Sequence, residues 1–303
     1  MSKVIVFGSL NMDLSVESPH MPKLGETVIG GGFVTNPGGK GANQAVAAAK
    51  LGAQVQMIGA VGADAFGDQM LAALADAGVS CERVSRAQNA PTGVALITRV
   101  GGDNFITVDS GANMVAGIDD VKAALDDIAQ PGDVFLCQLE CDFDTTMKAL
   151  KYAHEQGLYT VVNPAPAREL PGWVLPYLDF VVVNEGECET ITGIYPDDEA
   201  TCRAAMDKLA AAGVGLVAVT LGARGSMVLA GDEFLVSTPP AVKAVDTTCA
   251  GDTYIGAFLA AHARGKSAAD ALDLATKASA MATTKVGAQQ SIPLLSEVSG
   301  GIG

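Results

Sequence analysis

The chain has 303 residues, of which 49% are hydrophobic and 17% are charged, so it can bury a sizeable core and is not intrinsically disordered. Lys and Arg number 19 against 34 Asp and Glu, which gives a formal net charge of −15 at pH 7. This charge excludes generic binding to nucleic acid or to an anionic membrane surface, although backbone N–H groups can still bind a phosphate group.

Short apolar runs alternate with helical segments along most of the chain. The runs expected to form buried strands are residues 4–8, 55–59, 133–139, 158–162, 180–183 and 216–221. The segments expected to form helices are residues 41–51, 66–77, 144–156, 199–212, 251–264 and 268–285. Strands this apolar need helices on both faces. The alternation therefore predicts a single α/β domain over residues 1–303, with a three-layer α/β/α core and a mostly parallel sheet.

Two segments, residues 14–35 and 92–110, interrupt this alternation. The first is too long for a tight crossover between strands. The second has alternating apolar residues on both sides of a turn at residues 101–104, which is typical of an antiparallel hairpin. We expect the two segments to form a small β-sheet lid over the carboxyl edge of the core sheet, where open α/β folds bind ligands. The alternative is a peripheral hairpin that serves only packing.

Asn11 and Asp13 follow the first predicted strand and alternate with apolar residues, so both side chains should point to the same side. A short amide and a short carboxylate at this edge suit hydrogen bonds to neighbouring hydroxyl groups of a ligand. The alternative is that both residues only stabilise a turn.

A glycine-rich segment, residues 38–44, precedes the helix predicted at residues 41–51. Glycines at a helix N-terminus let backbone N–H groups approach a polar ligand closely. The spacing fits neither a P-loop nor a dinucleotide-binding fingerprint. Purely structural glycines are the alternative.

Two later segments suit a nucleotide. Asn184 and Glu187 follow the strand at residues 180–183, and amide and acidic groups at a strand end can hold hydrated Mg²⁺ beside phosphates. Residues 219–226 are expected to form a strand, a glycine turn and a second strand.

Small residues at positions 246–253 lead directly into an apolar helix. Free N–H groups of Cys249, Ala250, Gly251 and Asp252 would form a pocket for the charge that develops on a transferring phosphoryl group. The Asp252 carboxylate beside this pocket could accept a proton. The alternative is a first-turn carboxylate that only stabilises the helix.

These segments, in this order, resemble the pfkB family of carbohydrate kinases, from residues 8–13 to residues 287–291. The motifs at residues 39–49, 138–140 and 163–167 resemble those of members that act on D-ribose. The resemblance implies transfer of a phosphoryl group from ATP to the 5-hydroxyl of D-ribose, with Mg²⁺ as cofactor and K⁺ as activator. The alternatives are another sugar (2-deoxyribose or a hexose), a nucleoside, or a catalytically idle ligand-binding relative.

The resemblance also implies roles for individual residues. Asp252 would be the catalytic base, and the sugar would be bound by Asn11, Asp13, Gly39, Lys40, Asn43, Glu140 and Asp252. ATP and its phosphates would contact Asn184, Thr220, Gly222, Gly225, Cys249, Ala250, Gly251 and Thr276. Glu187 would hold Mg²⁺ through water, and the monovalent cation would lie among Asp246, Thr248, Ala282, Lys285, Gly287 and Ser291. The lid would also form the contact of a homodimer.

The pair Asn11 and Asp13 favours an acceptor with hydroxyls at both C2 and C3. With 2-deoxyribose, one polar group would stay unsatisfied, at a cost of about 1–3 kcal/mol. Aromatic residues make up only 5% of the chain, and none lies beside Asp13 or the glycine-rich segment, which disfavours stacking of a nucleoside base.

The chain departs from the family at position 249, where Cys replaces the usual Gly or Ala. Activity should survive, because only the backbone N–H is needed. Its thiol, at a helix N-terminus, is either reactive through a lowered pKa or an inert buried thiol.

The other features of the sequence indicate a cytoplasmic protein. None of the six cysteines forms a CxxC pair, so reduced thiols are expected. The N-terminal apolar run is too short for a signal peptide, and no run approaches the ~18 apolar residues of a membrane span.

Overall fold

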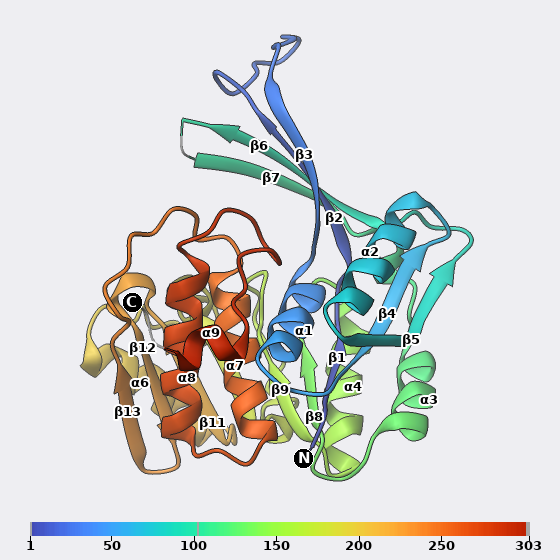
Figure 1. Ribbon diagram of the computed structural model, residues 1–303. Helices are drawn as coiled ribbons and strands as arrows, with labels where there is room; N and C mark the ends of the chain where they lie inside the picture. Colours follow the sequence, from blue (N-terminus) through green and yellow to red (C-terminus); the bar gives the residue numbers. More distant parts are fainter. Residues whose placement is uncertain (1, 102, 301–303) are drawn as a thin grey trace.

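A sheet of nine strands runs through the part of the chain that the computed structural model describes, residues 2–101 and 103–300 (Figure 1). The strands lie in the order β13-β12-β11-β10-β9-β8-β1-β4-β5. They are β1 (Val4–Phe7), β4 (Val55–Gly62), β5 (Val79–Ala87), β8 (Val134–Cys137), β9 (Tyr159–Val162), β10 (Phe180–Asn184), β11 (Leu216–Thr220), β12 (Ser226–Ala230) and β13 (Glu233–Ser237). Neighbours from β11 to β5 pair in parallel, whereas β12 and β13 add an antiparallel edge.

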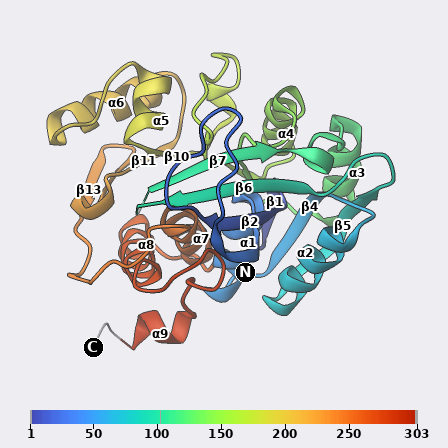
Figure 2. The same ribbon diagram turned by 90° about the horizontal axis from the view of Figure 1, so that it is seen from above.

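Helices cover both faces of this sheet (Figure 2). One face carries α1 (Lys40–Lys50), α2 (Ala65–Asp76), α7 (Ala250–Ala263) and α8 (Ala268–Ala282), and the other carries α3 (Ile118–Ile128), α4 (Phe143–Glu155), α5 (Glu185–Thr192) and α6 (Glu199–Ala211). The short helix α9 (Leu295–Ser299) packs against α8. Along β1, Val4 and Val6 are buried with the first group of helices, and Ile5 and Phe7 with the second. The predicted three-layer α/β/α fold is confirmed.

A second sheet, the lid sheet, has four strands in the order β3-β2-β6-β7. They are β2 (Asn11–Glu17), β3 (Gly31–Gly38), β6 (Gly93–Val100) and β7 (Asp103–Asp109). Figure 1 shows this sheet standing above the core, beyond the carboxyl end of β1, from which it is separated by only three residues. The hairpin predicted from residues 92–110 is confirmed, because β6 and β7 pair antiparallel from Val94↔Asp109 to Val100↔Asp103. Residue 102 of its predicted turn lies outside the described residues.

The first half of the lid sheet differs from the predicted segment of residues 14–35. β2 begins earlier, at Asn11, because Asn11 already pairs with Gly93 of β6 and with Gly38 of β3. Residues 18–30 form no strand and connect β2 to β3.

Other differences concern element ends and missed elements. α8 ends at Ala282 rather than at residue 285, because Thr283 O accepts the N–H groups of Val245 and Asp246 and the chain turns away. The elements that were not predicted are β5, β13, α3, α5 and α9. No helix in the described residues is both long and apolar enough to cross a membrane.

Candidate active site

Three adjoining cavities lie along the carboxyl ends of the core strands. The lid cavity, of about 690 Å³, is lined by both the lid sheet and the core. The loop cavity, of about 390 Å³, is lined by residues of the 220–226 turn and of α8. The middle cavity, of about 220 Å³, joins them: it shares Lys40, Cys249 and Asp252 with the lid cavity, and Thr220 and Gly251 with the loop cavity. The start of α7 therefore stands where the two larger cavities meet.

The lid cavity brings together every residue predicted to bind the acceptor. They come from β2, from the start of α1, from the segment after β8 and from α7, and they are Asn11, Asp13, Gly39, Lys40, Asn43, Glu140 and Asp252. Asn11 and Asp13 lie on the same face of β2, as the alternation predicts.

A buried residue that the sequence did not indicate orients Asn11. Asn113, on the short 3₁₀ helix η1 (Gly111–Met114), is 2% exposed. Its Nδ2 donates to Asn11 Oδ1 at 2.7 Å, and its Oδ1 accepts the N–H of Leu10 at 2.8 Å. Since Asn11 Oδ1 already accepts a hydrogen bond, the side-chain Nδ2 of Asn11 is the group left to donate to a ligand oxygen.

The glycine-rich segment allows a close approach of two chain segments. A Cβ on Gly41 would lie 2.5 Å from Ser9 N, and one on Gly39, whose φ is 87°, would lie 2.8 Å from Asn11 N. Both positions therefore require glycine because the backbone segments pack closely, and this packing has a consequence for the site. It brings the N-terminus of α1 against the segment between β1 and β2.

Glu140 is held where the N-terminus of α1 meets the segment between β1 and β2. Its Oε2 accepts the Ser9 hydroxyl at 2.5 Å and the N–H of Lys40 at 3.1 Å. Ser9 also accepts the N–H of Gly41 at 3.2 Å. Glu140 thereby links the segment after β8 to the start of α1 and keeps a negative charge at the wall of the lid cavity.

The Asp252 carboxylate is held by neutral amides. Asn43 Nδ2 donates to its Oδ2 at 3.1 Å, and Gln44 Nε2 donates to its Oδ1 at 2.9 Å. Asn43 is oriented in turn by Gln289, whose Nε2 donates to Asn43 Oδ1 at 3.1 Å. These donors point the carboxylate at the boundary of the lid and middle cavities.

Charges crowd the lid cavity. Burial, together with the negative charges of Glu140 and Asp252, raises the pKa of Asp13 to about 7. Burial alone would lower the pKa of Lys40, but the surrounding carboxylates of Asp252, Glu140 and Glu187 outweigh it and raise that pKa. The site therefore holds an ammonium group next to several carboxylates.

The loop cavity is lined mostly by small and apolar groups. The predicted nucleotide residues Thr220, Gly222, Gly225 and Thr276 all line it, as does Tyr254, which the sequence did not single out. Gly225 has a φ of 94°, and a Cβ there would lie 2.0 Å from Ser237 O, so the turn requires glycine. An apolar slot of this kind suits a flat heterocycle.

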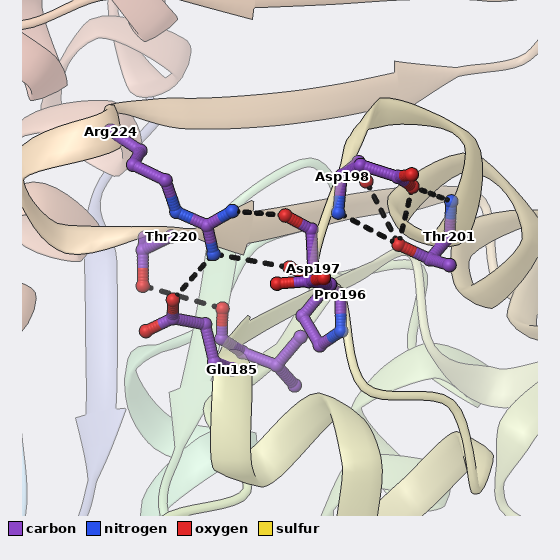
Figure 3. Close-up of polar contacts among 8 residues, drawn as sticks. Glu185, Pro196, Asp197, Asp198, Thr201, Thr220 and Arg224 are labelled. Atoms are coloured by element: carbon purple, nitrogen blue, oxygen red, sulfur yellow. Dashed lines mark hydrogen bonds and ion pairs between the residues drawn. The ribbon is translucent and has the colours of Figure 1, made fainter.

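Arg224 anchors the turn from outside the cavity (Figure 3). It belongs to the 3₁₀ helix η3 (Gly222–Arg224). Its Nη2 donates to Glu185 Oε1 at 2.7 Å and to Pro196 O at 3.2 Å, and its Nη1 donates to Asp197 O. These contacts connect the turn to the start of α5.

We expect Arg224→Met to raise KM for ATP by about two- to fivefold with little change in KM for the sugar, because exposed charge pairs are individually weak but this one positions a binding turn. Steady-state kinetics measure the effect. Arg203→Met, which breaks the exposed Arg203–Asp207 pair on α6, is the matched control and should change neither KM. Equal ATP KM values for wild type and Arg224→Met would contradict this role.

The start of α7 presents backbone N–H groups to the middle cavity. Helix geometry leaves the N–H groups of Gly251 and Asp252 without an intrahelical acceptor. The prediction that four N–H groups are free is wrong for Ala250, which donates to Thr247 O at 3.2 Å in the turn that precedes the helix.

Cys249 is the helix N-cap and has a φ of 66°. It is the one non-glycine residue with a positive φ in the described residues, which explains why Gly suits this position. The residue is buried, with 8% of its surface exposed. Burial, reinforced by Asp252, raises the pKa of the Cys249 thiol well above its ordinary value. The suggestion of a lowered pKa is therefore wrong, and the inert reading is favoured.

Asn184 and Glu187 form a reciprocal cap at the start of α5. Glu187 N donates to Asn184 Oδ1 at 2.8 Å, and Glu187 accepts from Asn184 N and Asn184 Nδ2, both at 2.9 Å. Both residues line the middle cavity. Burial raises the pKa of Glu187, whereas its hydrogen bonds and Lys40 act the other way. A carboxylate with this many donors fits Mg²⁺ through bound water better than by direct contact.

The residues predicted for the monovalent cation come from two adjacent loops. Asp246 accepts the N–H groups of Thr248 at 2.9 Å and Gly287 at 3.0 Å, and these three residues line the edge of the lid cavity. Lys285 turns away and pairs with Glu297 at 3.3 Å. Ala282 O accepts the N–H of Lys285 at 3.3 Å, and the Ser291 hydroxyl donates to Ala288 O at 2.7 Å. Asp246 is the one carboxylate among these six residues, and carboxylate and carbonyl oxygens are the hard ligands that suit such a cation.

Comparison with known proteins gives a consistent result. A family model described as pfkB family carbohydrate kinase matches residues 1–295. A ribokinase from Schizosaccharomyces pombe is 40% identical, with 99% of this chain and 98% of the relative covered. A deoxyribokinase from Salmonella typhi is 34% identical, with 97% and 96% covered.

Among solved structures, an Arabidopsis thaliana ribokinase complexed with ribose and ATP superposes with a TM-score of 0.90. Its sequence is 31% identical, and the match covers 99% of this chain and 98% of the other.

Proposed function

The chain belongs to the pfkB family of carbohydrate kinases, and on that premise we propose that it transfers the γ-phosphoryl group of ATP to the 5-hydroxyl of D-ribose. One observation carries the proposal. The Asp252 carboxylate stands at the boundary between the polar lid cavity, suited to a sugar, and the middle cavity, which leads to the mostly apolar loop cavity, suited to the adenosine part of ATP.

The chemistry follows from this placement. The ribose O5 forms a bond to the γ-phosphorus while the bond from phosphorus to the β-phosphate oxygen breaks and ADP leaves. The O5 proton passes to Asp252, and the N–H groups of Cys249 and Gly251 stabilise the charge on the transferring group. Closure of the lid sheet excludes water, which would otherwise compete as the acceptor.

Two cations complete the proposal. Glu187, with Asn184 beside it, would hold Mg²⁺ through water, and that ion would offset phosphate charge. The loops at Asp246 and Gly287 would hold K⁺ and thereby fix the turn that leads into α7. These assignments and a cytoplasmic location remain predictions.

The choice of ribose over 2-deoxyribose rests on Asn11 and Asp13. Both side chains enter the lid cavity from adjacent positions of one strand face, and each can bond one of two neighbouring hydroxyls. Loss of one hydroxyl leaves a buried polar group unsatisfied, at a cost of about 1–3 kcal/mol. The named deoxyribokinase relative keeps 2-deoxyribose as the second candidate acceptor.

A panel of acceptors tests the proposal. ATP-dependent ADP release is measured with ribose, 2-deoxyribose, fructose, adenosine and uridine, each with and without K⁺. The highest kcat/KM for ribose, raised by K⁺, supports the acceptor and the cation site together. A clear preference for 2-deoxyribose, a hexose or a nucleoside would overturn the acceptor assignment while keeping the family.

We also propose a homodimer through the lid sheet. The face of this sheet that points away from the lid cavity exposes large apolar side chains in neighbouring register: Phe33 is 66% exposed, Leu96 52% and Phe105 48%. A contiguous apolar face of this kind is typical of an interface.

Phe105→Asp should convert the dimer to a monomer, because it places a charge within that apolar face. Sedimentation velocity measures the change in mass. Trp173→Asp, at an exposed apolar residue outside the lid sheet, is the matched control and should leave the mass unchanged. An unchanged dimer with Phe105→Asp, or a monomeric wild type, would contradict this interface.

A further inference from the structure

Gln44 is a fully buried amide that touches the predicted catalytic carboxylate without lining the lid cavity. It lies in the second turn of α1 and is 0% exposed. Its Nε2 donates to Asp252 Oδ1 at 2.9 Å and to Asn163 Oδ1 at 3.1 Å. Its Oε1 accepts from Gln138 Nε2 at 2.6 Å. Every polar atom of this amide therefore has a partner.

The partners of Gln44 allow only one orientation of its amide. Asn163 is fixed by its own Nδ2, which donates to Val182 O at 3.0 Å and to Glu187 Oε2 at 3.3 Å. A half-turn of the Gln44 amide would set its Oε1 against the Asp252 carboxylate and its Nε2 against the Nε2 of Gln138. Both contacts are repulsive, so the amide nitrogen must face Asp252.

Gln44 also connects the two carboxylates that face the middle cavity. Through Asn163, the same amide that holds Asp252 is linked to Glu187, and the chain of donors runs from α1 to the strand ends of β9 and β10. Gln44 donates to Asp252 from within the core, whereas Asn43, which also donates to Asp252, lies at the wall of the lid cavity.

We propose that Gln44 is a positioning residue, which holds the Asp252 carboxylate in the orientation needed to accept the O5 proton. This inference rests on the proposed kinase activity. Gln44 itself does not line the lid or middle cavity, so it acts only through Asp252. The other titratable groups around Asp252 are Asp13 on β2, Lys40 on α1, Glu187 on α5 and Cys249 at the start of α7.

Gln44→Met keeps the length of the side chain and removes its hydrogen bonds. We expect kcat to fall by about 10–100-fold, because small displacements of a reacting group are costly. KM for ribose and for ATP should stay within about twofold. The acid limb of the kcat profile should move to higher pH, because the ionised carboxylate loses a donor.

A double-mutant cycle with Asp252→Asn separates positioning from general damage to the fold. If Gln44 acts through Asp252, adding Gln44→Met to Asp252→Asn lowers the residual rate no further. Full additivity of the two losses would overturn the proposal. If Asp252→Asn alone retains the wild-type rate, Asp252 is not the catalytic base. That outcome would contradict the proposed function, and it is distinguishable from failure of the Gln44 proposal.

Gln44→Glu is a second, isosteric variant in case Gln44→Met does not fold. Its carboxyl group can donate to Asp252 only when protonated. We therefore expect kcat of this variant to fall as pH rises, opposite to the wild type. A wild-type pH profile would contradict the positioning role.

Thr160→Val is the control for loss of a buried polar group. Thr160 on β9 is 0% exposed and bonds Tyr177 O at 2.6 Å and Asp179 Oδ2 at 2.9 Å, away from all three cavities. This variant should lower the melting temperature and leave kcat and its pH profile unchanged.

Discussion

Asp252→Asn is expected to lower kcat by about 10²–10⁴-fold, which is the range that a positioned general base contributes. Asn keeps the shape of the side chain but cannot take the O5 proton. Because the other groups that line the lid cavity are untouched, Kd for ribose should stay within about threefold. Initial rates and calorimetric titration with ribose measure the two quantities.

Asp270→Asn tests the competing explanation of Asp252 as a first-turn carboxylate that only stabilises a helix. Asp270 occupies the first turn of α8 and is exposed, where it contacts Ser267. Its replacement should cost some stability and leave kcat unchanged. If Asp252→Asn resembles Asp270→Asn in keeping the wild-type kcat, Asp252 is not the base.

Asp13→Asn should produce two opposite effects: weaker sugar binding and a more stable fold. The carboxylate is expected to accept hydroxyl hydrogen bonds, and hydrogen bonds to charged groups contribute about 1.5–3 kcal/mol, so KM for ribose should rise by about 10–100-fold. Ionising Asp13 in its buried, acidic surroundings, however, costs folding free energy.

The sign of the stability effect follows from the pKa of Asp13, which folding raises from 3.8 to about 7. The folded chain keeps a proton that the unfolded chain releases, so the free energy of unfolding falls as pH rises from about 4 to about 7. Asn does not titrate. Its gain over the wild type should reach about 2 kcal/mol at pH 8, after allowance for solvent screening, and nearly vanish at pH 4.

Chemical denaturation without ligand at pH 4 and pH 8 measures this difference. The low-pH comparison serves as the internal control for changes in packing. Equal stabilities of wild type and Asp13→Asn at pH 8, or an unchanged KM for ribose, would contradict the account. A site that is destabilising when empty and ionised is consistent with a role in binding.

The core of the fold is predictable from sequence because its strands are buried on both faces. Runs such as Val4–Phe7 and Phe180–Asn184 carry apolar residues at almost every position, which marks them as central strands. β5 lacks such a continuous apolar run, because it is an edge strand and carries exposed charged residues such as Glu82 and Arg83. The start of β2 could not be predicted in this way either, because Asn11 and Asp13 are polar and the strand pairs with β6, about 80 residues away in the chain.

The candidate site likewise contains some residues that the sequence indicates and others that only the structure reveals. Residues in local motifs, such as Asn43 and Asp252, could be identified from the sequence. The residues that orient them could not, because Asn113, Gln138 and Gln289 reach the site from segments about 100 or more residues away in the chain. The positive φ and deep burial of Cys249 likewise depend on tertiary packing, which overrides what a helix N-terminus alone implies about its thiol.

The position of the phosphate in the product tests the central claim most directly. Ribose and ATP are incubated with the protein and Mg²⁺, and the sugar product is examined by ³¹P–¹H correlation NMR. The expected result is coupling of the phosphorus to the two protons at C5, with this product formed about 10²–10⁴-fold more slowly by Asp252→Asn. Phosphate at any other carbon, or no phosphorylated ribose from the wild type, would contradict it.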